Sequence, residues 1–148
     1  EMTSSLVGSE MCIRDRYGGV HMVTFSKLHG LGNDYICINN KNILKERGLS
    51  QIAKYMCDRN FGIGADGLIL AEESDIADIK MRIFNKNGTE EEISGNGIRC
   101  FARYVFDNKI VNKTNMKVET KAIIQEVPVY IARRRDAKES VFPYPNRR

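Results

Sequence analysis

The sequence predicts an α+β domain in which short, mostly antiparallel strands pack around one apolar helix. The run from Ile79 to Asn85 alternates apolar and polar residues, which is typical of a strand. Asn87-Gly88 follows it, and Asn-Gly favours a tight hairpin turn. A helix is predicted over 97–106, because its apolar residues recur with a period near 3.6. These apolar residues are Ile98, Phe101, Ala102, Val105 and Phe106.

The remaining elements follow from local patterns along the chain. Ser50 is predicted to cap a helix that runs through about Cys57, since apolar residues follow it at helical spacing. Gly-rich or Asn-rich turns separate the other periodic segments. Strands are expected at 23–28, 35–39, 68–71, 79–85, 89–93 and 116–120, with another short strand at Val111.

Three regions of the 148-residue chain differ in character. Residues 1–21 have no helical or strand period, and 4–16 look like translated vector or adapter sequence. We expect 1–21 to be a non-native or disordered leader. Residues 22–120 form the predicted domain. Residues 121–148 hold seven Lys/Arg, three Asp/Glu and all three prolines, so this tail accounts for the whole net charge of +4.

Composition argues against several functional classes. No stretch approaches the roughly 18 apolar residues of a membrane span, and the N-terminus does not read as a secretory signal. A body of zero net charge offers no electrostatic case for nucleic-acid binding. Four cysteines without a CxxC spacing and only two histidines make a zinc site improbable. We expect no bound metal, and free thiols in a reducing compartment, the cytoplasm.

The residues just before the predicted central helix favour an anion site. Gly95-Asn96-Gly97 leaves backbone N–H groups free at a helix start, where they converge on one point. Ser94 would lie beside an anion bound there. This arrangement suits a small carboxylate substrate handled by a side chain at position 94.

Three segments together resemble diaminopimelate epimerase, a cofactor-independent amino-acid epimerase. The first is His29-Gly30-Leu31-Gly32-Asn33-Asp34-Tyr35, and the second runs from Asp58 to Gly67. The third runs from Phe84 to Cys100 and includes Ser94-Gly95-Asn96-Gly97. They occur in the family's order and near its spacing, and the resemblance covers residues 22 to about 120.

The resemblance implies a fold and a chemistry. Each half of such an epimerase wraps a curled sheet around a central helix, and two halves face each other across the site. Only the first half is expected here, so the second, C-terminal domain would be missing beyond 120. The family uses two cysteines to move the α-proton without a cofactor, and Ser94 stands where the first cysteine is found.

The resemblance also implies the ligand contacts and partners. Asn33 and Asn85 would hold the amino and carboxylate groups of the substrate, and Gly95 and Asn96 would complete the carboxylate cradle. The expected partner is a small amino acid, diaminopimelate, in lysine biosynthesis. Neither nucleic acid nor membrane is expected, and the full-length protein is expected to form a homodimer.

Other interpretations stay open. Ser94 is equally explained as a helix N-cap. Gly62-Ile63-Gly64-Ala65-Asp66-Gly67 fits GxGxxG, but a helix precedes it and a strand follows, which is the reverse of the dinucleotide context. Its glycines more plausibly permit a tight turn with positive φ. The chain is alternatively a related cofactor-independent racemase or dehydratase, or a non-catalytic carboxylate-binding half-domain.

Overall fold

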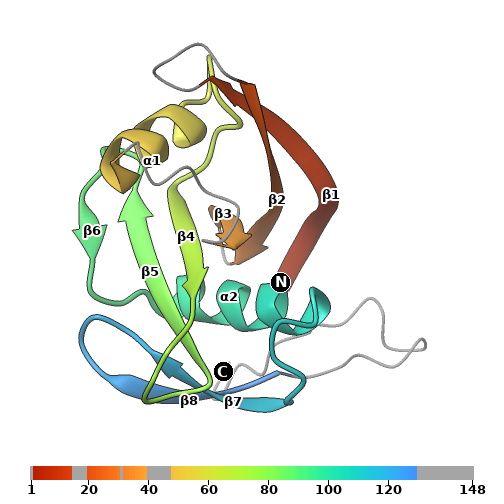
Figure 1. The fold of residues 1–148 in the computed structure, drawn as a ribbon, viewed down its shortest axis with the longest axis vertical. Coiled ribbons are helices and arrows are strands. Elements are labelled where there is room, and N and C mark those ends of the chain that lie inside the picture. Colours follow the sequence, from red (N-terminus) through yellow and green to blue (C-terminus); the bar gives the residue numbers. More distant parts are fainter. Residues whose placement is uncertain (1, 15–19, 31, 40–47, 130–148) are drawn as a thin grey trace.

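The computed structural model describes residues 2–14, 20–30, 32–39 and 48–129. Within them, an eight-stranded mixed sheet runs in the order β1-β2-β3-β4-β5-β7-β8, and β6 pairs with β5 off this path (Figure 1). The strands are β1 Met2–Arg14, β2 Val20–Gly30, β3 Asn33–Asn39, β4 Gly67–Glu72, β5 Ile79–Asn85, β6 Glu90–Glu91, β7 Asn115–Glu119 and β8 Ile124–Pro128. The helices are α1 Leu49–Cys57 and α2 Gly95–Asp107.

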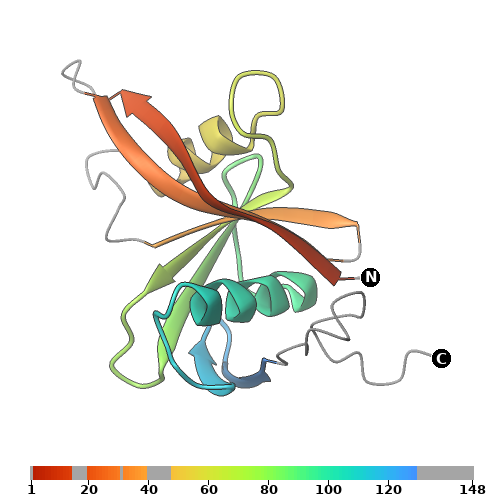
Figure 2. The same cartoon turned by 90° about the vertical axis from the view of Figure 1, so that its right-hand side faces the viewer.

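The sheet is mostly antiparallel and curls around α2, which confirms the predicted α+β class. Two pairings are parallel, β3 with β4 and β5 with β7, while the other described pairings are antiparallel. Both views place α2 between the β4–β5 part of the sheet and the β7–β8 hairpin (Figures 1 and 2). One helix can therefore bury its apolar side against several strands at once.

Alternation along the strands creates two apolar cores, one on each side of the sheet. On β4, Ile69 and Ala71 join the core that contains α2. Leu68 and Leu70 point the other way and join the core that contains α1. Phe101 lies in the α2 core and is fully buried. Because both faces of the central strands are covered, these strands show continuous burial and not simple amphipathic alternation.

Local capping explains where the helices begin. Helix α2 starts at Gly95, two residues earlier than predicted, because Ser94 is its N-cap. Ser50 does not cap α1, and that prediction was wrong. Gly48 holds the N-cap position, and its carbonyl accepts hydrogen bonds from the N–H groups of Gln51 at 3.0 Å and Ile52 at 3.1 Å.

Strand β5 has the predicted bounds, whereas the later strands differ. The Asn87-Gly88 turn is confirmed, with φ of +89° at Gly88, but the returning strand β6 is only two residues long. Val111 is not in a strand, so that prediction was wrong. The chain continues past Thr120 into β8, which pairs antiparallel with β7.

Regular structure also precedes Met22, where the sequence shows no period. Residues Met2–Arg14 form β1, and β1 pairs antiparallel with β2. The register of this pairing shifts between Met2 and Ser5 and again between Leu6 and Ser9. Despite these shifts, pairing with β2 gives residues 2–14 a strand structure, whereas the lack of a period in this segment predicts disorder.

Candidate functional site

The start of α2 is organised by Ser94. Its hydroxyl oxygen accepts a hydrogen bond from the Gly97 N–H at 3.1 Å, and its carbonyl accepts one from the Ile98 N–H at 2.8 Å. The N–H groups of Gly95 and Asn96 precede the first intrahelical bond, and neither has an acceptor among the described residues. They carry the positive end of the helix dipole, so this end of α2 favours an anion.

A tyrosine connects Ser94 to Asn33. The Tyr35 hydroxyl lies 3.0 Å from Ser94 Oγ and also hydrogen-bonds the Asn33 side chain. Burial raises the pKa of Tyr35 despite these two hydrogen bonds, so its hydroxyl keeps its proton at neutral pH. The structure thereby brings together two predicted site residues that are 61 positions apart in the sequence.

The first turn of α2 rests directly on the sheet. A Cβ atom placed on Gly97 would lie 3.0 Å from Ile83 Cδ1 of β5, and one on Gly30 would lie 3.2 Å from Cys100 Sγ and 3.8 Å from the Asn96 carbonyl oxygen. Gly30 is paired with Asn33. Asn96 therefore lies beside the β2–β3 turn that carries Asn33.

Strand register relates Asn85 to the same area. Tyr35 on β3 is the partner of Gly67 on β4, and Gly67 is in turn the partner of Asn85 on β5. A Cβ on Gly67 would lie 3.2 Å from the Tyr35 ring, so the ring covers this glycine. Asn85 follows Ile83 by two positions, and alternation places both on the α2 side of the sheet. Asn33, Asn85 and Ser94 thus belong to one face.

Cys100 does not take the place of Ser94. Its side chain is fully buried in the α2 core, and burial raises its pKa to about 12. A thiol in that state is protonated at neutral pH and is a poor base. Arg103, on the same helix, forms an ion pair with Asp107 at 2.7 Å on the outer side of α2.

The glycine-rich loop after α1 has a structural role that explains its motif. The loop folds back over the end of the helix, and its N–H groups reach carbonyls of the last turn. Those of Ile63 and Gly64 donate to the Met56 carbonyl at 2.9 and 3.0 Å. Gly64 has φ of +84°, as expected, but Gly67 does not have a positive φ, and neither does Gly62. Its lack of a side chain instead allows close approach to the Tyr55 carbonyl.

Sequence reasoning missed a network of charged residues beside the site. Asp34 is 6% exposed, and its carboxylate accepts two hydrogen bonds from Arg59, at 2.9 and 3.1 Å. Arg59 also pairs with Asp66 at 3.1 Å, and Lys27 pairs with Asp34 at 3.2 Å. Asp34 lies in the 29–35 segment, and Arg59 and Asp66 lie in the 58–67 segment. Opposite charges in two glycine-containing segments were the sequence signal that could have indicated this network.

The network controls the ionisation of Asp34. Burial by itself raises the pKa of this carboxyl, but hydrogen bonds from Arg59 and Lys27 outweigh it and hold the pKa well below its usual range. A depressed pKa contributes stability that is complete above the unfolded value of about 3.9 and is lost as pH falls toward the folded value. The contribution is therefore present throughout the neutral range.

We expect Asp34→Asn to lower the free energy of unfolding by about 2 kcal/mol at pH 7, because it removes the buried carboxylate that Arg59 and Lys27 share and leaves Arg59 paired with Asp66 alone. The difference from wild type should shrink as pH falls below about 4. Urea unfolding followed by circular dichroism from pH 7 to 3 measures it. Asp107→Asn removes a carboxylate whose side chain is 27% exposed, against 9% for Asp34, and should cost less than about 1 kcal/mol. Equal losses in both variants, or a difference independent of pH, would contradict the conclusion that Arg59 and Lys27 hold the Asp34 carboxylate ionised.

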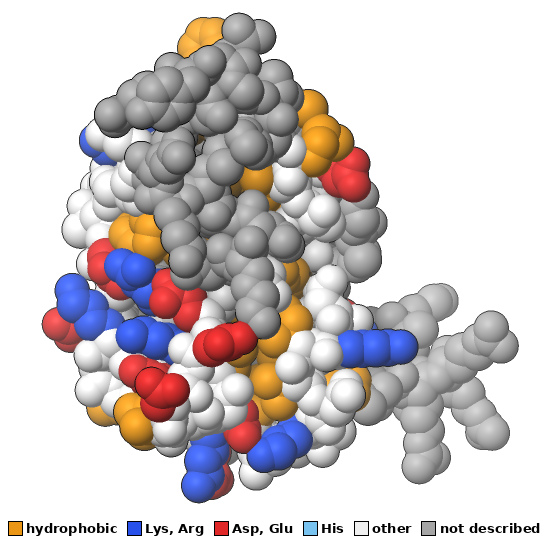
Figure 3. Space-filling model, viewed as in Figure 1, with side chains coloured by type: hydrophobic (Ala, Val, Ile, Leu, Met, Phe, Trp, Pro, Cys, Tyr) orange, Lys and Arg blue, Asp and Glu red, His pale blue; other side chains and the backbone are white. Residues whose placement is uncertain are grey.

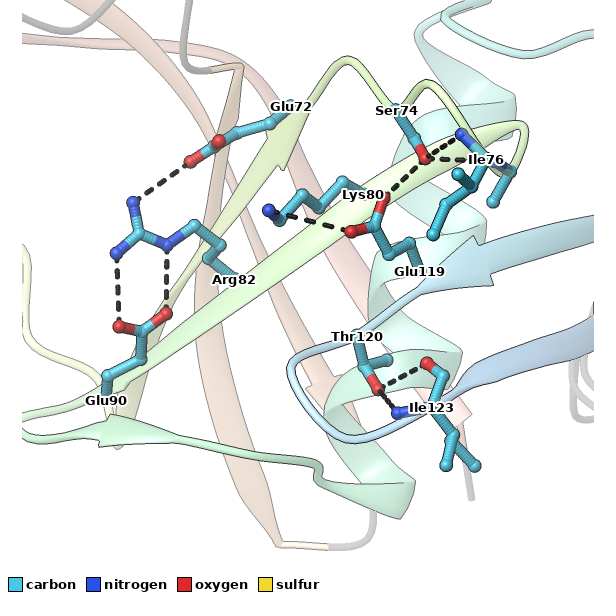
Figure 4. A network of polar contacts seen from close by, with 10 residues as sticks. Glu72, Ser74, Ile76, Lys80, Arg82, Glu90, Glu119, Thr120 and Ile123 are labelled. Atoms are coloured by element: carbon cyan, nitrogen blue, oxygen red, sulfur yellow. Dashed lines mark hydrogen bonds and ion pairs between the residues drawn. The ribbon is translucent and has the colours of Figure 1, made fainter.

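A second network holds the segment that leads into Ser94. Arg82 on β5 donates to both carboxylate oxygens of Glu90 at 2.9 and 3.1 Å, and to Glu72 at 3.3 Å (Figure 4). Its guanidinium lies 5.3 Å from the centre of the Phe84 ring. Hydrogen bonds from Arg82 hold the pKa of Glu90 below its usual range. This bidentate pair reinforces the short β6 pairing four residues before Ser94.

The described residues also bear on metal ligation, membrane spans and surface charge. Residues 2–14, 20–30, 32–39 and 48–129 contain no group of three or more metal-ligating side chains. Neither helix in them is long and apolar enough to cross a membrane. On the face in Figure 3, described acidic and basic side chains lie interspersed, without a large patch of one sign.

Sequence comparison with known proteins agrees on one family. The family model for diaminopimelate epimerase matches residues 25–137. Diaminopimelate epimerase from Caldanaerobacter subterraneus subsp. tengcongensis is 56% identical over 98 residues, covering 66% of this chain and 35% of the relative. The one from Alkaliphilus metalliredigens is 46% identical over 107 residues, covering 72% and 38%. The chain thus spans little more than a third of the length of these relatives.

Solved structures show the same fold at low sequence identity. A PhzF-family phenazine biosynthesis protein from Bacillus anthracis aligns with a TM-score of 0.56 and 17% identity, covering 87% of this chain and 37% of that one. A PhzC/PhzF protein from Clostridium difficile gives 0.51 and 16%, covering 66% and 34%. At such identity the likeness concerns the fold alone.

Proposed function

Because this chain belongs to the diaminopimelate epimerase family, we propose that it is the substrate-binding N-terminal portion of such an enzyme. The whole enzyme would convert LL- to meso-diaminopimelate in lysine biosynthesis, in the cytoplasm. It would do so by moving the α-proton between two bases, without a cofactor. Ser94 occupies the position of the first base, so the chain is impaired in proton transfer.

The observation that carries this proposal is the meeting of Asn33, Tyr35 and Ser94 at the start of α2. The N–H groups of Gly95 and Asn96 would bind the substrate carboxylate, where the helix dipole stabilises charge that develops as the α-proton leaves. Asn33 and Asn85 would bind the remaining polar groups from the same face of the sheet. The α-carbon would then lie beside residue 94.

Hydrogen bonding at Ser94 explains why proton transfer is impaired. A hydroxyl is a far weaker acid than a thiol and needs a separate base to activate it. Ser94 Oγ accepts from the Gly97 N–H and contacts the Tyr35 hydroxyl, and Tyr35 retains its own proton. Neither neighbour can remove a proton from Ser94. A cysteine here would instead have its pKa lowered by the helix start.

Deuterium uptake at the α-carbon of LL-diaminopimelate tests the proposal. In D2O, the wild-type chain is expected to bind the amino acid but to exchange its α-proton no faster than buffer. Ser94→Cys should accelerate exchange measurably, because a single thiolate suffices to remove the proton. Both proteins contain the buried Cys100, so wild type controls for other thiols. Ser94→Ala, which lacks both the hydroxyl and the thiol, controls for loss of the cap.

The outcomes separate the parts of the proposal. Exchange by wild type well above buffer would overturn the impairment. Absence of binding by both wild type and Ser94→Cys would overturn the choice of substrate. The N-cap geometry of Ser94 also favours a second candidate, a non-catalytic carboxylate-binding domain. Binding by both proteins, with no exchange even by Ser94→Cys, would support that candidate.

A further inference from the structure

The ends of three neighbouring strands are tied together just behind the proposed ligand residues. The Asp66 N–H donates to the Asp34 carbonyl at 2.9 Å, and the Lys86 N–H donates to the Asp66 carbonyl at 3.1 Å. Asp34 directly follows Asn33, and Lys86 directly follows Asn85. A continuous series of backbone hydrogen bonds therefore connects the two asparagines through Asp66.

The side chains of the two aspartates reinforce this connection but need a cation between them. The Asp34 N–H donates to Asp66 Oδ2 at 3.2 Å, and the Asp66 N–H donates to Asp34 Oδ1 at 3.0 Å. This exchange holds two carboxylates close together, and like charges at such a distance repel. A positive group that contacts both carboxylates relieves this repulsion.

Arg59 is the group that reaches both carboxylates. One of its terminal nitrogens contacts Asp34 at 2.9 Å and Asp66 at 3.1 Å, and the other contacts Asp34 at 3.1 Å. Lys27 pairs with Asp34. A planar guanidinium has the fork geometry that bridging requires, whereas an ammonium acts as a point charge.

The strand geometry places this bridge away from the ligand. Successive residues of β3 face opposite sides, so Asp34 points away from the α2 side on which Tyr35 meets Ser94. The Arg59 side chain is 53% exposed. Its removal leaves no cavity in either core, and its effect on a ligand has to pass through Asp34 and Asp66.

We infer that Arg59 is a positioning residue that fixes the spacing between Asn33 and Asn85 by bridging Asp34 and Asp66, an inference that rests on the proposed function. Without the bridge, repulsion between the carboxylates separates the ends of β3 and β4. Asn33 then moves relative to Asn85, and the two amides no longer match one amino acid. Small misplacements of this kind reduce activity by up to about a hundredfold.

The test compares the complete 148-residue chain with its Arg59→Met variant. The side-chain amide resonances of Asn33 and Asn85 are recorded by NMR in the free protein, and LL-diaminopimelate is then titrated. We expect both resonances to shift and the affinity to fall by about tenfold. Asn108, whose amide donates to the Tyr104 carbonyl at the far end of α2, is the internal reference. Arg103→Met removes another partly exposed Arg–Asp pair and is the matched control.

Each outcome decides the inference. Unchanged Asn33 and Asn85 resonances with wild-type affinity would overturn it, even if Arg59→Met unfolds more easily, because a purely structural role predicts only that loss. If wild type binds no diaminopimelate, the proposed function fails, and the free-protein resonances still decide the inference. If Arg59→Met does not fold, Arg59→Lys replaces it, because lysine keeps the positive charge but lacks the planar guanidinium that bridges two carboxylates. The same amide resonances and the same affinity are then measured.

Discussion

Replacing Phe101 by alanine is expected to lower the free energy of unfolding by about 3–5 kcal/mol. Phe101 is fully buried at the centre of α2, inside the core that the curled sheet encloses. Truncation removes most of an aromatic side chain and leaves a cavity that surrounding strands cannot fill without losing register. Urea unfolding followed by circular dichroism measures the change, which should appear as a lower midpoint with a similar slope.

The chain offers its own control for this substitution. Phe61 is 82% exposed in the loop after α1. Phe61→Ala therefore deletes the same side-chain atoms at a solvent-exposed position, where no core cavity results. Its effect should stay within about 0.5 kcal/mol. A loss for Phe61→Ala as large as that for Phe101→Ala would mean that α2 is not the centre of the main core.

Gly62→Ala is expected to destabilise the protein by about 3 kcal/mol or more, at the upper end for overpacking. A Cβ atom there would overlap the Tyr55 carbonyl oxygen and lie 2.8 Å from the Met56 carbonyl oxygen. Both obstacles are backbone atoms of the last turns of α1, so no side-chain rotation relieves them. The loop would have to leave the helix and give up the hydrogen bonds that Ile63 and Gly64 donate.

Gly48→Ala is the matched control for Gly62→Ala. Gly48 precedes α1 in an ordinary extended conformation, and a Cβ there would meet nothing within 4 Å. We expect a change of less than about 1 kcal/mol, since glycine and alanine differ modestly outside a strained position. Similar losses at both positions, measured by thermal unfolding, would show that close approach is not what requires glycine at 62.

Local patterns predicted the elements whose signals are local. Strand β5 shows clear alternation, and the Asn-Gly turn that follows it is unambiguous, so both were placed correctly. Strand β8 was missed because only Val127 is buried in it, and one buried residue makes no period. The parallel pairing of β3 with β4 was not predictable, since the choice of neighbour depends on contacts between distant segments.

The candidate site was predictable in part for the same reason. Ser94 and the glycines around Asn96 stand out because a helix start has its own sequence signature. Asp34, Arg59 and Asp66 are separated by up to 32 positions, and their charges resemble those of any solvated loop until the fold brings them together. A cluster of charged residues that are distant in sequence produces no periodic pattern from which it could be predicted.

The two parallel pairings have a kinetic consequence. A complete helix separates β3 from β4, and another separates β5 from β7, because parallel neighbours cannot be joined by a tight turn. For each parallel pair, the two ends of a long intervening segment must come together, at a cost in chain entropy, before the strand contacts can offset that cost. The chain is therefore expected to reach its native state in roughly milliseconds to seconds. During that interval, unpaired strand edges are available to other chains, so refolding yield should improve on dilution.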